Sequence, residues 1–415
     1  MGGWGSYLEN MYQNVIIVGG GLNGCMLAQA LAQGGIGCTV IDAQNPDTMR
    51  RNDFDGRSYA LAAASQKMMQ ALNLWDDIAH DAQPMLDIKV TDGRPGSGPA
   101  PFFMEFNHQE LGQGPLGYLV EDRHLRRTLL NHMSRAGITY KTAITVIDQV
   151  TTADGVSVTL SDGSTVDGSL LIGADGRQSG TAKRAGLKQT GWRYNQSSLV
   201  CAVEHELPHD GVAHQYFLPA GPLAILPLTG NRCSIVWTET TEMAQAINAL
   251  PDEDYLNILR PRFGDFLGAI SLTGERFTYP LGLNLSYDTT AQRLALVGDS
   301  ARGVHPIAGQ GLNAGLKDVA SIAEVLTDAH RRGQDLGSDQ VLAEYARWRR
   351  FDNLTLAAAT DGFNRLFSND NSAIRTFRDL GMGAINAMPA LRRRFMKEAA
   401  GLSGDIPKLL QGQSL

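Results

Sequence analysis

Residues 15–24 read VIIVGGGLNG, and this stretch decides the fold. Residues 15–18 are apolar and β-branched, which is typical of a strand buried on both faces. A glycine turn follows, then residues 25–33 (CMLAQALAQ), which are rich in helix-forming residues, and residues 38–41 (CTVI), a second buried strand that ends at Asp42. This order of strand, helix and strand predicts a parallel βαβ unit and an α/β fold.

Three glycines at positions 19, 21 and 24 have the spacing of a dinucleotide-binding turn. The first makes the tight turn, the second lets the backbone approach a pyrophosphate, and the third lets the helix pack on the strand. The N-terminus of this helix offers N–H groups to the phosphates. Asp42, 18 residues after Gly24, is placed to bind the adenosine ribose. Chance glycine spacing is the alternative, and the surrounding strands and helix count against it. The residues expected at the pyrophosphate are Gly19, Gly21, Leu22, Asn23 and Gly24.

Composition and charge narrow the class of protein. The 415 residues are enough for two packed domains, and the net charge of −7 supplies no general attraction for nucleic acid. No apolar run reaches the ~18 residues of a membrane-spanning helix. Residues 1–13 lack the features of a secretory signal, and four scattered cysteines without a CxxC motif predict reduced thiols and no metal site. We therefore expect a cytoplasmic enzyme.

Further elements follow along the chain. Residues 92–101 (DGRPGSGPAP) have the composition of a flexible loop, and residues 190–285 predict a separate sheet. Strand patterns occur at residues 156–160, 170–172, 224–228, 234–238 and 294–297. Helical patterns occur at residues 65–72, 123–135, 312–326, 340–366 and 374–400.

Two later motifs each follow a buried strand. Residues 173–176 (GADG) come after residues 170–172, and residues 298–299 (GD) come after residues 294–297. The carboxylate of Asp299 could bind a ribityl hydroxyl, and the GQGLN sequence that starts at Gly309 could present helix N–H groups to an electron-rich ring edge. Taken singly, each motif is explained as well by a helix-capping aspartate or a turn glycine.

Together these motifs resemble the class A FAD-dependent aromatic monooxygenases, with their GxGxxG, DG and GD fingerprints in order. The resemblance covers residues 12–412. Within this family, the chain resembles the ubiquinone-biosynthesis hydroxylase branch most specifically. The stretches that carry it are residues 55–61 (DGRSYAL), 120–123 (VEDR), 226–228, 234–237, 305–319 and 399–407.

The resemblance implies a Rossmann-like FAD-binding domain with an inserted β-sheet substrate domain and C-terminal helices. The implied FAD domain is discontinuous, the substrate domain is inserted in it, and the C-terminal region is helical. The boundaries that we expect are residues 12–85, 110–185 and 286–366 for the FAD domain, 86–109 and 186–285 for the substrate domain, and 367–415 for the C-terminal region.

The resemblance also implies the chemistry. FAD would be bound tightly but not covalently, and NAD(P)H would reduce it as a transient co-substrate, which fits the lack of a second GxGxxG motif. Oxygen would then add at the flavin C4a position, and the hydroperoxide would hydroxylate a polyprenylated, lipophilic phenol in ubiquinone biosynthesis. Two alternatives stay open: a hydroxylase of a small soluble aromatic acid, and a flavoprotein that acts as a scaffold without turnover.

Two arginines acquire roles by the resemblance. Arg57 and Arg123 would contact phosphate or the ribityl chain, because a guanidinium offers several fixed donors. The alternative is a pair of surface arginines bonded to Asp55 and Glu121. Ala60, in the same motif as Arg57, would also lie at the cofactor.

The implied surroundings of the flavin come from three motifs. Asp175 would order the turn near FAD and the path of the nicotinamide. Pro306 matches a family proline whose carbonyl lies over the flavin, and His305 could relay a proton, although a single histidine is more often structural. These two are the expected catalytic residues. The ribityl chain and the flavin ring would contact Asp299, Gly309, Gly311, Leu312 and Asn313.

The chain departs from the family pattern in two places. Many members have a histidine where this chain has Arg302, and this difference weakens any role assigned to a histidine at that position. We expect the side chain of Arg302 to be exposed. Residues 191–195 (GWRYN) do not match the WxWxIP element of the flavin halogenases, which counts against halogenation.

The C-terminal segment is a candidate membrane contact. An apolar stripe beside a basic cluster is what an interfacial helix needs, and an insoluble substrate needs either a bilayer surface or delivery by a partner in a ubiquinone-synthesis complex. The alternative is an ordinary amphipathic helix packed on the FAD domain. The stripe consists of Phe377, Leu380, Ile385, Met388, Leu391 and Phe395, and the basic cluster of Arg392, Arg393, Arg394 and Lys397. A membrane contact of this kind would lie on the inner face of the membrane.

Overall fold

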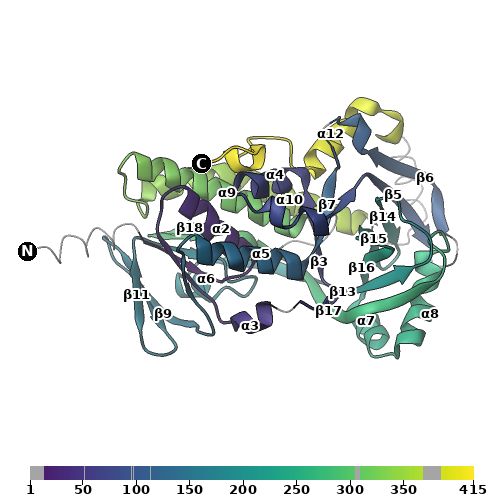
Figure 1. The fold of residues 1–415 in the computed structure, drawn as a ribbon, viewed down its shortest axis with the longest axis horizontal. Helices are drawn as coiled ribbons and strands as arrows, with labels where there is room; N and C mark the ends of the chain where they lie inside the picture. Colours follow the sequence, from purple (N-terminus) through teal and green to yellow (C-terminus); the bar gives the residue numbers. More distant parts are fainter. Residues whose placement is uncertain are drawn as a thin grey trace, which may run out of the picture.

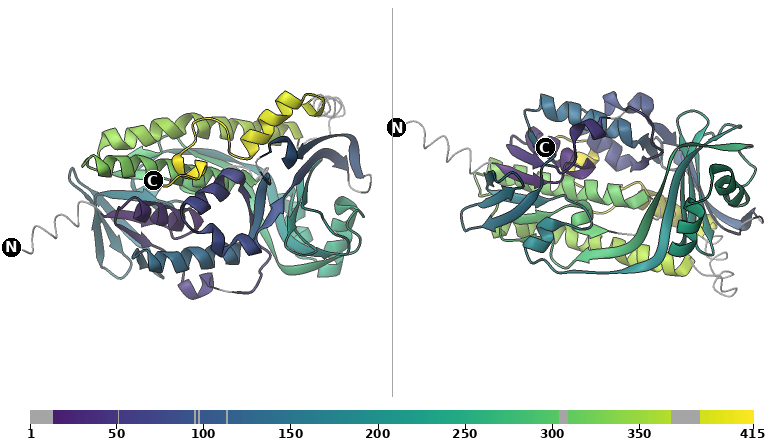
Figure 2. Two further views of the ribbon diagram at one scale, coloured as in Figure 1. Left: turned by 45° about the horizontal axis from the view of Figure 1, so that its top comes forward. Right: turned by 90° about the horizontal axis from the view of Figure 1, so that it is seen from below.

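The computed structural model describes residues 14–367 and 385–415, apart from residues 51, 95, 97, 113 and 304–308. Two large sheets lie at opposite ends of an elongated molecule, and long helices run beside them (Figure 1). Figure 2 shows the same separation from two further directions.

The first sheet has six strands in the order β18-β19-β12-β1-β2-β8. Its neighbouring strands are parallel except for β18 and β19, which are antiparallel. The central strands β1, β2 and β12 are buried along their whole length, as their continuous apolar sequences predict. The bounds are β1 Val15–Val18, β2 Cys38–Ile41, β8 Thr139–Lys141, β12 Leu170–Gly173, β18 Thr290–Ala291 and β19 Leu294–Leu296.

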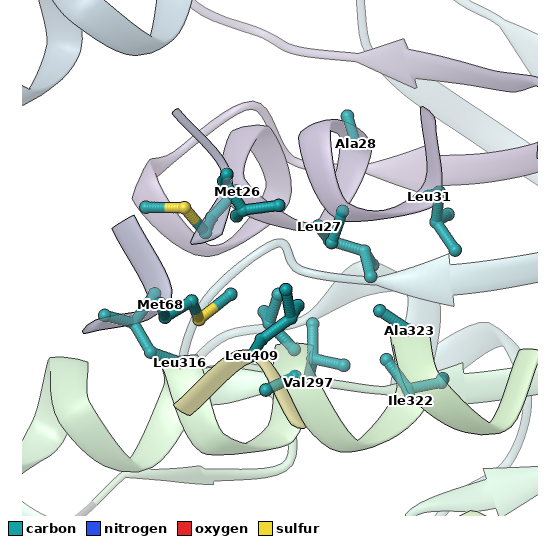
Figure 3. Close-up of a cluster of buried hydrophobic side chains, with 14 of the residues drawn as sticks. Met26, Leu27, Ala28, Leu31, Met68, Val297, Leu316, Ile322, Ala323 and Leu409 are labelled. Carbon is teal, nitrogen blue, oxygen red and sulfur yellow. The ribbon is translucent and has the colours of Figure 1, made fainter. Parts of the chain in front are cut away.

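Helices α2 and α9 pack together over one face of this sheet. Figure 3 shows Leu27 and Leu31 of α2 above Ile322 of α9, in a cluster that also holds Val297. Each of these aliphatic side chains is buried, and each contributes about 1.5–3 kcal/mol by leaving water. The predicted helices here are confirmed, with bounds α2 Leu22–Gln33, α4 Ala63–Ala71, α5 Asp122–Arg135, α9 Gln310–Arg331 and α10 Asp339–Phe367.

The opposite face is covered by a three-stranded antiparallel sheet, β11-β10-β9. Val158 and Leu160 of β10 pack on Ile16 of β1 in one buried cluster. The strand predicted at residues 156–160 is confirmed, and it pairs with β11 across the turn that follows it. The bounds are β9 Val146–Thr151, β10 Val156–Leu160 and β11 Thr165–Gly168.

The second large sheet has eight strands, β20-β17-β13-β16-β15-β14-β5-β6. Helices α7 and α8 cover its outer face, where Trp237 and Tyr255 are fully buried. This confirms a separate sheet built mainly from residues 190–285. The bounds are β5 Asp87–Arg94, β6 Gly98–Asn107, β13 Gln189–His205, β14 Val212–Leu218, β15 Gly221–Leu228, β16 Arg232–Thr240, β17 Ile270–Ser286, β20 Arg302–Gly303, α7 Thr241–Asn248 and α8 Asp252–Phe263.

A small sheet, β3-β7-β4, lies where the two parts meet. Met85 and Leu119 of this small sheet pack on Ala202 and Leu228 of the eight-stranded sheet. The face of the eight-stranded sheet that carries Ala202 and Leu228, its inner face, therefore turns toward the small sheet. The bounds are β3 Ser58–Ala62, β4 Gln83–Met85 and β7 Gly117–Glu121.

The flexible loop predicted at residues 92–101 is wrong. Most of that stretch belongs to strands β5 and β6, which pair antiparallel, with Arg94 opposite Gly98 and Gly93 opposite Pro99. β6 is the edge strand of its sheet, and an edge strand tolerates proline because the missing N–H needs no partner on the outer side. The prolines that indicate a loop in the sequence are thus accommodated in a hairpin.

The C-terminal helix α12, Pro389–Ala399, begins with proline at its first turn, where the missing N–H costs nothing. Residues 374–384 of the helix predicted at residues 374–400 lie outside the described part. No helix among the described residues is long and apolar enough to cross a membrane. The remaining short helices are α3 Pro46–Met49, α6 Gly180–Arg184 and the 3₁₀ turns Trp75–Asp77, Ala79–Asp81, His108–Glu110, Gly298–Ser300 and Lys408–Gln411.

The cysteines are buried and unpaired: Cys25, Cys38, Cys201 and Cys233. Burial raises the pKa of Cys38 and of Cys233 to about 12, so these thiols stay protonated at neutral pH. Within the described ranges, no group of three or more histidine, cysteine, aspartate or glutamate side chains could hold a metal ion.

Candidate active site

The glycine turn between β1 and α2 brings the first motif against the second. Gly19 has φ +105°, and a Cβ there would lie 2.6 Å from the carbonyl carbon of Ala174 and 2.9 Å from the nitrogen of Asp175. Gly24 is packed equally closely on the backbone of Gly19. Two of the three glycines are therefore required by packing, as the sequence predicts.

Gly21 is the exception, because a Cβ there would meet nothing within 4 Å. It caps the N-terminus of α2, where no side chain of the described residues caps the helix and no acidic residue lies in the first turn. The N–H groups of this turn are therefore available to an anion. A small pocket opens at this turn, lined by Gly20, Gly21, Leu22, Cys25, Met49, Arg126, Leu129 and Leu130.

Arg126 is a residue that the sequence did not single out. It lies on α5, lines the pocket beside Gly20 and Gly21, and donates from Nε to Asp122 at 2.7 Å. A guanidinium at a turn with free N–H groups adds a positive charge where a pyrophosphate is expected. Its only sequence signal is the spacing of four residues from Asp122 on one helix face.

Asp42 lies at the end of β2 beside Gly20. Its Oδ1 accepts from the N–H of Gln44 at 3.0 Å, and its Oδ2 accepts from the hydroxyl of Tyr140 at 3.2 Å. A carboxylate has about four acceptor positions, so capacity remains for a ribose hydroxyl. The predicted location at the strand end is therefore present.

Asn23 connects the glycine turn to the third motif. Its side chain lies in a slot between Gly298 and Gly315, where a Cβ would come within 3.1 Å and 2.9 Å of the Asn23 Cγ. Its Oδ1 is buried and accepts no hydrogen bond from the described residues. The predicted cofactor residue thus also holds α2, the GD turn and α9 together.

The second and third motifs are tied to each other by Arg177. Asp175 accepts from Ser179 Oγ at 2.5 Å and from the N–H and Oγ1 of Thr181 at 3.0 and 2.9 Å, which orders the turn before α6. Asp299 accepts from Arg177 Nε at 3.1 Å. Arg177 directly follows the GADG motif at residues 173–176, but the sequence did not indicate its partner.

The N-terminus of α9 is fastened to strand β3. The Asn313 amide donates to Ala60 O at 2.8 Å and Gly309 O at 3.0 Å, and its Oδ1 accepts from the N–H of Ala62 at 2.9 Å. Gly309 has φ +63° and caps α9 without a side-chain cap among the described residues. A Cβ on Gly311 would meet nothing within 4 Å, so this turn also has an open side.

The structure therefore brings Ala60, Gly309 and Asn313 together as expected. Leu312 follows Gly311 and packs on the main core. His305 and Pro306, the expected catalytic residues, lie outside the described residues.

Both arginines with implied cofactor roles have protein partners. Arg57 Nη2 lies 2.6 Å from Asp55 and 3.3 Å from Asp122, and its guanidinium lies 5.6 Å from the centre of the Phe277 ring. Arg123 donates from Nε to Glu121 at 2.7 Å. Arg57 is thus paired with Asp55 and Arg123 with Glu121, the alternative to contacts with the cofactor.

The inner face of the eight-stranded sheet carries a row of partly exposed side chains. Side chains alternate between faces along a strand, so Val200 and Val236 lie on the face opposite Leu199 and Trp237, which point to α7 and α8. Paired residues extend the row across five strands. This inner row consists of Phe277, Val200, Val236, Ala224 and Gln215.

The inner row lies beside the contact between the two parts of the molecule. Leu226, the residue after Ala224 on the same face of β15, packs in the same cluster as Ala60, which is bonded to Asn313. The α9 N-terminus, strand β3 and the inner row therefore converge. The sequence did not single out the inner row, although the alternation of residues 234–238 is its signal.

These residues fit an extended FAD. Gly21 and Gly311 leave open space at the N-termini of α2 and α9. Asp42, at the end of β2 where the adenosine ribose is expected, has free acceptor positions. Uncapped helix N-termini suit a pyrophosphate and an electron-rich ring edge.

Comparisons with known proteins agree with this geometry. Residues 12–351 match the family described as FAD binding domain. The ubiquinone hydroxylase UbiL of Rhodospirillum rubrum is 45% identical, covering 97% of this chain and 93% of that protein. The 3-demethoxyubiquinol 3-hydroxylase of Escherichia coli K12 is 30% identical, covering 95% and 100%.

A solved structure supports the fold. The p-nitrophenol 4-monooxygenase PnpA of Pseudomonas putida DLL-E4 superposes with a TM-score of 0.78 at 18% identity, covering 94% of this chain and 98% of that one. The predicted class A monooxygenase fold, the FAD cofactor and the enzymatic nature of the chain are confirmed. The chain belongs to the family of FAD-dependent ubiquinone-biosynthesis hydroxylases.

Proposed function

We propose that this chain hydroxylates the ring of a neutral phenol with a long apolar tail, with FAD as cofactor and NAD(P)H and O2 as co-substrates. The inner row of the eight-stranded sheet is the observation that supports a substrate with an apolar tail and no charge. The names of the relatives from Rhodospirillum rubrum and Escherichia coli, which act on ubiquinone and a ubiquinol, support a quinol-type ring.

From Ser234 to Thr238 of β16 and at the positions paired with them on β13 and β15, the inner face carries no ionisable side chain; Arg232, at the start of β16, is paired with Glu121. An aromatic acid would need a cation there, because burying an unpaired carboxylate is costly. Arg57 is the cation at the Phe277 end, and two carboxylates already pair with it. The positions are Ser198, Val200, Ala202, Ala224, Leu226, Ser234, Val236 and Thr238.

The chain's residues would hold the reactants and exclude water. FAD, when bound, supplies the oxygen activation and transfer. The glycine turn, Asp42 and Arg126 would bind its ADP part, and the first turn of α9, fixed by Asn313, would present N–H groups to the ring. The inner row would cover the substrate and exclude water from the reacting atoms. His305 and Pro306 stay predicted catalytic residues.

The division of the chain into domains stays our proposal as well. Residues 12–85, 110–185 and 286–366 would form the FAD domain, and residues 86–109 and 186–285 the substrate domain. Pairing of β5 and β6 with β14 in one sheet supports the assignment of residues 86–109.

Helix α12 would provide a peripheral membrane contact. Met388 and Phe395 are exposed beside the exposed Arg393, Arg394 and Lys397, and such a combination favours an anionic lipid surface. Arg392, part of the predicted basic cluster, is instead bonded to Glu110 at 2.9 Å. A lipid surface there would deliver an insoluble substrate to the end of the molecule that holds the eight-stranded sheet, next to β6.

The test is oxidation of NAD(P)H by the purified holoenzyme with phenols that share one ring and differ in tail length. We expect the phenols to stimulate the oxidation of NAD(P)H and to be hydroxylated on the ring, and both rates should increase with the length of the tail. Stimulation by an aromatic acid but not by the tailed phenols would support the soluble-acid hydroxylase instead. No stimulation by either substrate, with FAD bound, would support the scaffold.

A further inference from the structure

Arg302 is not the exposed residue that the sequence suggested. It is 3% exposed and lies on β20, opposite Leu285 of β17. Its Nη1 donates to Asp318 Oδ2 at 2.6 Å. The expectation of an exposed arginine is therefore wrong, because β20 turns this side chain toward α9 and α10.

Asp318, on α9, is fully buried and holds three partners. Its Oδ2 accepts from the backbone N–H of Gly298 at 3.0 Å as well as from Arg302, and its Oδ1 accepts from Arg349 Nε at 2.8 Å. Gly298 begins the turn that carries Asp299. The carboxylate thus ties the GD turn to both α9 and α10.

The arrangement is not optimised for stability alone. Nε and Nη2 of Arg302 are buried and have no hydrogen-bond partner among the described residues. A buried guanidinium with unsatisfied donors costs free energy, and a buried ion pair is often no more stable than apolar residues of similar volume. A charged group retained at such a site is better explained by what it positions.

We propose that Arg302 is a positioning residue, whose permanent charge holds Asp318 and the Gly298–Asp299 turn in one geometry for FAD at every physiological pH. An arginine guanidinium stays protonated in proteins, whereas an imidazole at the same place would lose its charge within that range. The inference rests on the proposed function and on the place of Asp299 at the ribityl chain of FAD, which the family resemblance implies.

The charged and titratable groups that face Arg302 and Asp318 come from α9, α10 and the turn that carries Asp299. Burial, and then the charge of Asp318, raise the pKa of Tyr345 well above its ordinary value, and its hydroxyl donates to Leu296 O at 2.8 Å. Burial by itself would raise the pKa of Asp352, but Lys317 and Arg349 lower it. The charged and titratable neighbours are Asp318 and Lys317 of α9, Tyr345, Arg349 and Asp352 of α10, and Asp299 of the turn.

The experiment titrates the apoprotein with FAD, read by quenching of flavin fluorescence, between about pH 5.5 and pH 8.5, where histidine changes its charge. Wild type and Arg302→Lys should bind FAD with a dissociation constant that is independent of pH. Arg302→Met should bind about tenfold more weakly throughout, the loss of one charged hydrogen bond. Arg302→His should resemble Arg302→Lys at the acid end and Arg302→Met at the alkaline end.

Two controls separate the possible failures. Asp299→Ala should weaken FAD binding, and if it does not, the proposed place of Asp299 fails rather than the role of Arg302. If Asp299→Ala weakens binding while Arg302→Met binds as wild type does, the inference is overturned. Thermal melting of each apoprotein checks the fold. Should Arg302→Met not fold, a wild-type affinity of Arg302→His at the alkaline end would overturn the inference by itself.

Discussion

Arg232 Nη2, at the start of β16, donates to Glu121 Oε1, at the end of β7, at 2.7 Å. The Glu121 side chain is only 2% exposed and also accepts from Arg123 Nε at 2.7 Å. Phe54 lies under both guanidinium groups, 5.0 Å from that of Arg232 and 5.7 Å from that of Arg123. This carboxylate therefore joins the small sheet to the eight-stranded sheet and helps to fix the cofactor end relative to the inner row.

Glu121→Gln should lower the free energy of unfolding by about 2 kcal/mol, because it replaces a buried carboxylate, bonded to two partly exposed guanidinium groups, by a neutral amide. Urea denaturation followed by circular dichroism measures the change. Glu253→Gln, which removes an exposed carboxylate paired with Arg260, is the matched control and should remain close to wild type. An equal effect of the two substitutions would contradict the role given to Glu121.

The same residue predicts a pH dependence. Burial by itself would raise the pKa of Glu121, but the hydrogen bond from His124 and the charges of Arg232 and Arg123 lower it to about 2. Since the pKa in the folded state lies below the ordinary value of about 4.3, the stabilisation is complete above that value and is lost as the pH falls toward 2. The difference in unfolding free energy between wild type and Glu121→Gln should therefore shrink from neutral pH to about pH 2.5. A constant difference over that range would show that the carboxylate is not held in this way.

Gly21→Val should lose the flavin, because the side chain would fill the open space at the α2 N-terminus and keep the pyrophosphate from the backbone. The absorbance of the purified protein and the FAD released on heating measure the loss. Gly362→Val, on α10, is the control, since a Cβ there also meets nothing within 4 Å but lies far along the sequence from the motifs. A full complement of FAD in Gly21→Val would remove this turn from the site.

Val236→Asp should reduce kcat/KM for a tailed phenol by about 100-fold, since it places a carboxylate on the inner row, while FAD stays bound. Val150→Asp makes the same change at an exposed position of β9 and should have no effect. Steady-state kinetics and the flavin spectrum of both variants give the answer. Loss of FAD from Val236→Asp, or an unchanged kcat/KM, would place the substrate elsewhere.

Replacing Arg393, Arg394 and Lys397 by Gln should reduce salt-sensitive sedimentation with anionic liposomes, since each basic residue near the surface contributes about 1 kcal/mol. Arg392 is left intact because its bond to Glu110 fastens α12. The control replaces three exposed basic residues, Arg332 directly after α9 and Arg347 and Arg350 on α10. Equal sedimentation of both triple variants and wild type would leave delivery of the substrate to a partner protein.

Much of the FAD end could be predicted because its signals are local. The βαβ unit at residues 15–41 has its strand and helix patterns next to each other, and the glycine spacing follows from contacts within one turn. The position of Asp42 at a strand end follows from the same pattern. By contrast, the hairpin at residues 87–107 was missed because proline and glycine indicate a loop unless the strand is known to be an edge.

The sequence by itself determined the family, the cofactor and the residues of the three motifs, since each depends on short stretches whose backbone geometry is set by their own glycines and apolar runs. Only the tertiary structure decided which side chains face one another across the chain. The burial of Arg302 against Asp318, the approach of Arg126 to Gly21, and the inner row formed by Phe277, Val200, Val236, Ala224 and Gln215 all depend on strand register and helix packing. Such contacts join residues that no local periodicity relates, because the packing of complete sheets and helices sets them.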